Sequence, residues 1–143
     1  MNSFRFPLQK VLDWRHTQLD LEEARFKQQL AALAALERER AGWEAAGIKA
    51  EIQVRDWNPL AGRDLTALGN FRLNVKQREN EIDARRLECR KSLEAQQSVM
   101  LEARRRCRLL ERLKERKLAA WQSVRDHELE QLASESFLAK WGR

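Results

Sequence analysis

The sequence predicts an all-α protein, a long antiparallel two-helix coiled coil (a helical hairpin) whose second helix is longer than the first. More than half of the 143 residues are Ala, Glu, Lys, Leu or Arg, and a share near 50% is typical of coiled coils and long helices. Only five Gly and two Pro are available for turns, and there is no Tyr, which disfavours folds rich in β-strands. Apolar residues also recur at helical spacing along most of the chain.

Helix breakers gather near the middle of the chain and place the turn there. Pro7 comes just before the first periodic residue, a position that proline favours at helix starts. Residues 56–64 contain an Asn-Pro pair and Gly62, and Asp64 or Thr66 can cap the helix that follows. We expect one coiled-coil unit over residues 1–143, with a first helix at about 7–55, a loop at about 56–64 and a second helix at about 65–139.

Each predicted helix carries an apolar stripe. The first stripe comprises Leu8, Leu12, Leu19, Phe26, Leu30, Leu33 and Leu36, is interrupted by Arg15 and by Glu22 or Glu23, and continues after a phase slip with Trp43, Ile48 and Ile52. The second follows a seven-residue step through Leu68, Val75, Ile82, Cys89, Gln96, Ala103, Leu110, Lys117 and Val124, with Leu93, Met100, Cys107 and Trp121 at the second seam position. Stripes with this period pack against a partner helix, and a short connection makes neighbouring helices antiparallel.

The two helices differ in length, so part of the second one lacks a partner. At 1.5 Å per residue they run roughly 70 Å and roughly 110 Å, and pairing outward from a bend near residue 60 places Leu8 opposite about Leu113. The last two dozen residues then extend beyond the first helix, and their apolar residues are Leu118, Trp121, Val124, Leu129, Leu132, Phe137, Leu138 and Trp141. An unpartnered apolar stripe marks an interaction site; an end that folds back or frays is the alternative.

No motif indicates catalysis, a cofactor or a metal. His16 and His127 are isolated, and the chain has no HExxH, no GxSxG, no phosphate-binding Gly loop and no EF-hand pattern. Cys89 and Cys107 lie too far apart on one helix to form a disulfide, and no Cys/His group has zinc spacing. We expect ordinary seam or surface roles for these residues, and a protein that is not an enzyme.

The sequence also bears on where the chain resides. No apolar run approaches the roughly 18 residues that a membrane span needs. The first residues, Met1 to Arg5, lack the basic and apolar regions of a signal peptide. We therefore expect a cytoplasmic protein without membrane insertion.

Basic charge is concentrated in one stretch of the second helix. Between residues 104 and 117 eight basic residues stand against two acidic ones, a surplus equal to the +6 of the whole chain. The basic residues are Arg104, Arg105, Arg106, Arg108, Arg112, Lys114, Arg116 and Lys117. Such a stretch can attract an acidic protein surface, the phosphates of a nucleic acid or an anionic membrane. Because no aromatic residue lies among these arginines, we favour a protein partner or a solvated face over nucleic acid.

Five Trp residues also suggest binding surfaces, because two paired helices cannot bury all of them. A second apolar region is expected near the bend, from Trp43, Ile48, Ile52, Trp57, Phe71 and Val75.

Two stretches of the chain resemble the flagellar export protein FliJ family. The opening Phe4-Arg5-Phe6-Pro7-Leu8-Gln9-Lys10-Val11-Leu12, followed by Arg15, is similar to the family's start, with Pro7 where a basic residue is common. The stretch Leu110-Glu111-Arg112-Leu113-Lys114-Glu115-Arg116-Lys117, then Trp121 and the acidic run to Glu130-Gln131-Leu132-Ala133, is similar to its second-helix signature.

This resemblance implies a cytoplasmic component of the bacterial flagellar type III protein export apparatus, peripherally associated with the inner membrane. Family members form a coiled coil like the central stalk of rotary ATPases. They bind the hexameric export ATPase and promote its assembly, contact the cytoplasmic domain of the export-gate membrane protein, and escort export chaperones. By matching position, Phe71 and Val75 are implied in the gate contact. We add Arg104, Arg105, Arg106, Arg108, Arg112, Trp121 and Val124 as candidate partner-binding residues.

Two other functions remain open at this stage. One is the equivalent stalk protein of a virulence-type injectisome, which shares the coiled-coil design. The other is a basic coiled coil that dimerises through residues 118–141 and binds nucleic acid, with an affinity that falls steeply as salt rises.

Overall fold

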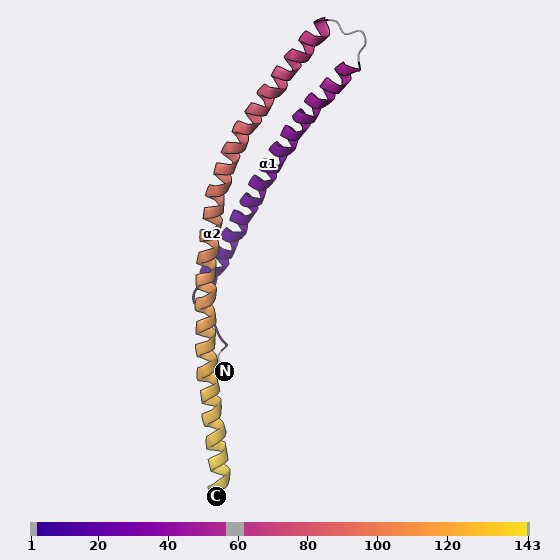
Figure 1. Cartoon of the computed structure of the whole chain (residues 1–143). Helices are drawn as coiled ribbons and strands as arrows, with labels where there is room; N and C mark the ends of the chain where they lie inside the picture. The colour runs from indigo at the N-terminus through magenta and orange to yellow at the C-terminus, as the bar shows by residue number, and fades with distance from the viewer. Residues whose placement is uncertain (1–2, 57–61, 143) are drawn as a thin grey trace. The chain divides into compact units, whose positions relative to one another are not determined.

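The computed structural model describes residues 3–56 and 62–142 and consists there of two α-helices (Figure 1). Helix α1 spans Gln9–Arg55 (47 residues) and helix α2 spans Gly62–Trp141 (80 residues). The predicted all-α hairpin with a longer second helix is confirmed. Residues 57–61 of the predicted loop lie outside the described residues.

The helix starts agree only partly with the predicted signals. Pro7 and Leu8 form a turn ahead of α1, in which the Gln9 amide donates a hydrogen bond to the Phe6 carbonyl at 3.1 Å. Helix α2 begins about three residues earlier than predicted, so Asp64 and Thr66 lie inside it rather than at its cap. The Thr66 hydroxyl donates to the Gly62 carbonyl at 3.0 Å. Asp64 still lies in the first turn, where a negative charge is favourable.

The chain divides into two compact units, which we describe separately. The central unit comprises Glu22–Val99, and the terminal unit comprises Met1–Leu21 with Met100–Arg143. In the central unit α1 and α2 run side by side (Figure 1). Residue numbers fall on α2 as they rise on α1, which makes the pairing antiparallel, as the contacts Glu22–Gln96, Gln29–Cys89, Arg40–Asp83 and Glu51–Arg72 show.

The seam of the central unit, meaning its row of inward-facing side chains, follows the predicted seven-residue step on α2. Val75 and Ile82 are buried, with 7% and 2% of their surfaces exposed, and Leu68, Cys89 and Gln96 are half-buried. On α1 the seam differs from the prediction. Phe26, Leu33 and Leu36 are half-buried as predicted. Leu30, Ile48 and Ile52 are exposed instead of inward, and the further inward positions belong to Gln29, Gly47, Ala50 and Val54.

Small residues explain the shifted seam at the end of α1. A Cβ atom at Gly47 would lie 3.5 Å from Val75 Cγ1, so the Gly47 backbone faces the buried Val75. Ala50 and Val54 follow on the same side, at helical spacing from Gly47. The bulky Ile48 and Ile52 occupy the neighbouring stripe and face solvent.

A polar layer interrupts the seam at Glu22, which is buried. The Gln96 side-chain amide donates to the Glu22 carboxylate and, at 3.2 Å, to the Glu22 carbonyl. Arg25, one turn away, donates to the same carboxylate at 3.0 Å. Each oxygen of the buried carboxyl group thus accepts a hydrogen bond. A buried polar pair of this kind can be satisfied in only one alignment of the two helices.

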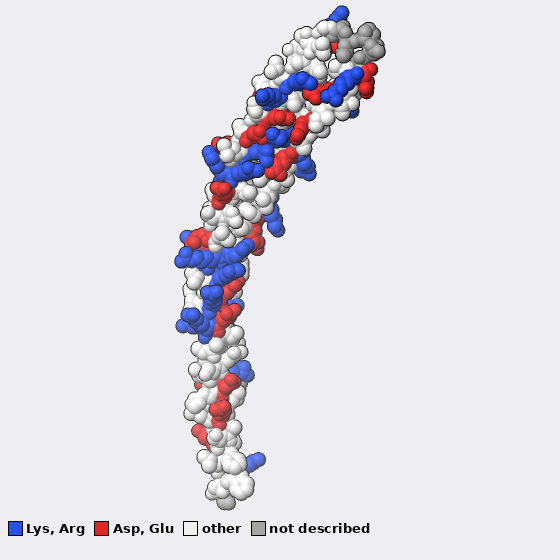
Figure 2. All heavy atoms as spheres, viewed as in Figure 1, with Lys and Arg blue, Asp and Glu red and all other residues white. Residues whose placement is uncertain are grey.

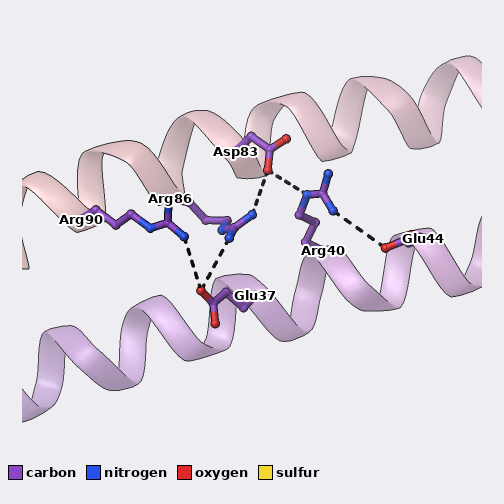
Figure 3. Close-up of polar contacts among 6 residues, drawn as sticks. All are labelled: Glu37, Arg40, Glu44, Asp83, Arg86 and Arg90. Carbon is purple, nitrogen blue, oxygen red and sulfur yellow. Dashed lines mark hydrogen bonds and ion pairs between the residues drawn. The ribbon is translucent and has the colours of Figure 1, made fainter.

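Ion pairs flank the seam of the central unit (Figure 3). Arg40 Nε lies 2.8 Å from Asp83 Oδ1, and Arg86 reaches both Asp83 (3.2 Å) and Glu37 (3.6 Å). Arg90 adds a contact to Glu37 at 3.9 Å. The cluster joins α1 to α2 through charges of opposite sign and supplements the apolar contacts.

In the terminal unit the N-terminal segment packs on α2. Phe6 and Leu12 are buried, and the Phe4 and Trp121 rings meet with centroids 6.0 Å apart. His16 contacts Cys107 and Glu111. Leu8, predicted in the seam opposite about Leu113, is 39% exposed. Its neighbour Pro7 lines a hollow with Lys117 and Trp121, so the pairing lies about one helical turn beyond the predicted position.

Beyond Trp121, every described residue of α2 is exposed. We call residues 122–142 the overhang. Their exposure agrees with the prediction that the last two dozen residues or so extend beyond the first helix.

Truncation of the most buried aliphatic side chain tests how much the seam stabilises the fold. We expect Ile82→Ala to lower the free energy of unfolding by about 2–5 kcal/mol, since it removes buried methyl groups and leaves a cavity. Urea unfolding followed by circular dichroism measures this change. The control is Leu87→Ala, at a position 56% exposed, where we expect a change within about 0.5 kcal/mol. Equal effects of the two substitutions would contradict the seam.

A second test uses the pH dependence of the ion-pair cluster. The hydrogen bond from Arg40 holds the pKa of Asp83 below its ordinary value. Because the folded pKa is the lower one, the stabilisation is present above the unfolded value of about 3.9 and is lost as pH falls through the folded pKa. We expect Asp83→Asn to lower the thermal midpoint near neutral pH, and the gap to the parent protein to shrink below about pH 4. A difference in thermal midpoint that stayed constant with pH would refute the Arg40–Asp83 contact as its cause. The control is Asp126→Asn in the overhang, where we expect no such pH-dependent difference.

Candidate partner-binding surface on the second helix

One side of α2 in the terminal unit combines arginines with exposed leucines. We call it the basic face, and it lines a shallow groove of about 280 Å³ formed by Leu101, Arg104, Arg105, Arg108, Leu109 and Arg112. The spacings of three and four residues bring these side chains onto one side of the helix. Four of the five predicted arginines therefore form one surface. The fifth, Arg106, points elsewhere and pairs with Glu102 at 3.2 Å.

The electrostatics of the basic face favour an acidic partner. Arg105 has one weak ion pair, at 3.7 Å from Glu102. Arg108 and Arg112 are exposed and make no ion pair with any residue that the structure describes. Leu101 and Leu109 expose 49% and 54% of their surfaces between these charges. A surface of this composition can hold carboxylates with the guanidinium groups while apolar side chains of the partner cover the leucines.

The overhang differs in character from the basic face. Its exposed apolar residues are Val124, Leu129, Leu132, Phe137, Leu138 and Trp141. The Phe137 and Trp141 rings form a pair with centroids 5.9 Å apart. Residues 122–142 contain two basic and four acidic residues. Figure 2 shows basic side chains crowded on α2 ahead of the overhang and a mostly uncharged surface at its end.

Trp121 lies where the segment that precedes α1 contacts α2. Phe4 covers part of its ring, and the Arg125 guanidinium lies 5.4 Å from the ring centroid. Together with Arg5, Pro7 and Lys117, the two aromatic residues line an open hollow of about 650 Å³. Of the two C-terminal site residues predicted, Val124 is 61% exposed and available, whereas Trp121 already has contacts within the chain.

The two residues predicted for the gate contact differ in their exposure to solvent. Phe71 is half-buried and lines a small groove of about 180 Å³ with Val54, Asp64 and Leu68. Val75 is buried against Gly47. The expectation that Val75 offers a binding surface is therefore wrong, because its side chain faces the seam. Phe71 remains a candidate.

The second apolar region predicted near the bend is only partly present. Ile48 and Ile52 are exposed, whereas Trp43 is half-buried with Arg78 at 5.9 Å from its ring centroid. Trp57 lies outside the described residues.

The structure also assembles a cluster that the sequence analysis missed. His16 Nδ1 lies 3.3 Å from Cys107 Sγ, and His16 Nε2 lies 3.3 Å from Glu111 Oε1. These residues are the one His/Cys/Asp/Glu group with metal-binding geometry among the described residues. Burial raises the pKa of the Cys107 thiol above its ordinary value, and Glu111 adds to this effect. Motif spacing could not reveal the cluster, since 91 residues separate His16 from Cys107. The one feature of the sequence that could have indicated it is the predicted pairing of the two helices.

Two further findings bear on function. Neither described helix contains a stretch long and apolar enough to cross a membrane. No family model, curated protein or solved structure matches the chain.

Proposed function

We propose that the chain is a stalk-like component of the bacterial flagellar type III protein export apparatus. In this role it binds the hexameric export ATPase, promotes its assembly and links it to the export gate and to chaperones, at the cytoplasmic side of the inner membrane. The observation that carries the proposal is the overhang, because its 21 described residues are all exposed and include six large apolar side chains. Exposed apolar stripes of this kind mark protein-binding surfaces.

The opening motif supports the proposal through its packing. Phe4, Phe6 and Leu12, which carry the resemblance to the family, contact α2 or are buried in the terminal unit. They hold the start of the chain against α2 just before the overhang begins. The opening motif thus has a structural role, which is to pack the start of the chain on α2 as far as the beginning of the overhang.

The basic face supplies the second part of the proposed contact. Its arginines and the exposed leucines lie on α2 upstream of the overhang. Long-range attraction to an acidic lining of an ATPase ring would speed encounter, and the apolar overhang would then supply the short-range contacts. One large apolar side chain contributes about 1.5–3 kcal/mol when buried, before the costs of ordering.

Two alternatives make different predictions. An injectisome stalk would act on the ATPase of that system, and the neighbouring genes distinguish it from a flagellar component. A nucleic-acid-binding dimer would bind RNA with a steep salt dependence. The exposed leucines between the arginines favour a protein over RNA, because they offer no aromatic surface for base stacking.

The direct test is ATP hydrolysis by the flagellar export ATPase of the same organism, with and without this protein. We expect stimulation of hydrolysis together with a ring-sized complex in size-exclusion chromatography. A variant with Leu132, Phe137 and Trp141 replaced by Ser, which leaves the basic face intact, should abolish the stimulation. No stimulation and no complex at about micromolar concentrations, a range typical of specific encounters, would refute the proposal.

Charge reversal tests the contribution of the basic face. In the variant Arg105→Glu, Arg108→Glu and Arg112→Glu the net charge falls from +6 to zero. We expect association with the ATPase at low salt to slow by about tenfold or more, since steering raises on-rates by about 10–10³-fold. Stopped-flow measurement of the association rate across a series of salt concentrations tests this expectation.

A matched control has the same net charge but leaves the basic face intact. It combines Arg38→Glu, Arg63→Glu and Arg85→Glu, three exposed positions away from the groove. Equal slowing by the two variants would assign the effect to net charge and refute a role for the basic face.

A further inference from the structure

We propose that His16, Cys107 and Glu111 form a binding site for a zinc-type divalent metal ion in the terminal unit. His16 comes from α1, and Cys107 and Glu111 come from successive turns of α2. The proposal does not rest on the proposed function. It rests on the way in which the pairing of the helices brings three different metal-binding side chains together.

The distances suit coordination by one ion. One ligand atom from each residue lies within 4.8 Å of the other two. The Cys107 Sγ and His16 Nδ1 atoms are 3.3 Å apart, and a tetrahedral ion with Zn–S near 2.3 Å and Zn–N near 2.0 Å separates such ligands by about 3.5 Å. In the structure Glu111 contacts the other ring nitrogen, Nε2, at 3.3 Å, so its carboxylate must rotate toward the Nδ1 side to join them.

The three proposed ligands differ in burial: Cys107 is buried, whereas His16 and Glu111 are partly exposed. Cys107 is 1% exposed and fixed in the seam, so its sulfur is held in one position. The His16 and Glu111 side chains are 46% and 44% exposed, which gives an ion a path from solvent and leaves the carboxylate free to turn. Asp20 and Arg15 also act on the thiol: Asp20 raises its pKa and Arg15 lowers it.

The ligand set selects the class of metal. Thiolate and imidazole together favour zinc and similar soft or borderline ions over magnesium and calcium, which take oxygen ligands. Three protein ligands leave a fourth position for water or for a ligand from a partner. Because the thiol must lose its proton to coordinate, binding strengthens as pH rises.

Metal binding at this place has a structural consequence. An ion held by all three side chains cross-links the first turns of α1 to α2 within the terminal unit. Cys107 lies among the arginines of the basic face in sequence, so the cross-link would stiffen the segment of α2 that presents them. The site therefore offers a way for a metal ion to stabilise the start of the hairpin.

Cobalt substitution provides the test. The full-length protein, reduced and freed of metal with a chelator, is titrated with Co²⁺, whose thiolate complexes absorb in the near ultraviolet, and then with Zn²⁺ as competitor. We expect one equivalent of Co²⁺ to produce a thiolate charge-transfer band that Zn²⁺ removes, and Zn²⁺ to raise the thermal midpoint. Cys107→Ser should abolish the band, and His16→Gln and Glu111→Gln should each weaken binding at least about tenfold, since even outer contacts of metal ligands alter affinity by about 10–100-fold.

The chain offers a matched control for two of the three ligands. Cys89→Ser removes the other cysteine, whose thiol faces the Gln29 carbonyl at 3.8 Å, and His127→Gln removes the other histidine, in the overhang. Both controls should bind like the parent protein. Circular dichroism establishes that each variant keeps its helix content. If Cys107→Ser does not fold, the variants at the more exposed positions His16 and Glu111 test the site instead. Absence of the band in the parent protein, its persistence in Cys107→Ser, or its loss in Cys89→Ser would overturn the proposal.

Discussion

The seam between α1 and α2 is the interaction on which the other features of the structure depend. Two helices can bury little surface against each other, and the buried apolar residues that the structure describes are Phe6, Leu12, Val54, Val75, Ile82, Met100 and Cys107. Each contributes more to holding the helices together than one residue of a large globular core would, because few others share the task. Inter-helix ion pairs such as Arg40–Asp83 supplement this thin seam.

Polar contacts within and beside the seam determine how the helices align. A stripe of Leu and Ala residues fits several alignments almost equally well, because each shift by a heptad restores similar apolar contacts. The buried Glu22 with Gln96, and the ion pairs of Asp83 and Glu37 with arginines opposite, are satisfied in one alignment only. Within the terminal unit, the pairing of α1 with α2 places His16 beside Cys107 and Glu111, so the proposed metal site follows from that pairing.

The proposed function uses the surfaces that the seam leaves over. Beyond Trp121 no α1 residue covers α2, and the apolar stripe continues on the overhang. The basic face consists of arginine and leucine side chains that lie side by side on α2, outside the seam. One helix thus presents a charged surface for attraction at a distance and an apolar surface for close contact, which is a suitable combination for a protein that assembles with a larger partner.

The sequence by itself determined the all-α hairpin, the longer second helix, the seven-residue seam of α2 from Leu68 to Leu110 and the exposed overhang, because heptad spacing and helix breakers act locally. The predicted continuation of this seam to Lys117 and Val124 is wrong, since both residues are exposed. The sequence misplaced Leu8, Leu30, Ile48 and Ile52, which are exposed, since periodicity shows that a stripe exists but not which of two adjacent stripes faces the partner. It also assigned Val75 to a binding surface, where packing against Gly47 buries it. The cluster of His16, Cys107 and Glu111, and the grouping of four arginines apart from Arg106, were decided only by the tertiary structure. Residues 91 positions apart meet only when two helices are paired in one alignment, and side-chain and backbone contacts across the seam fix that alignment.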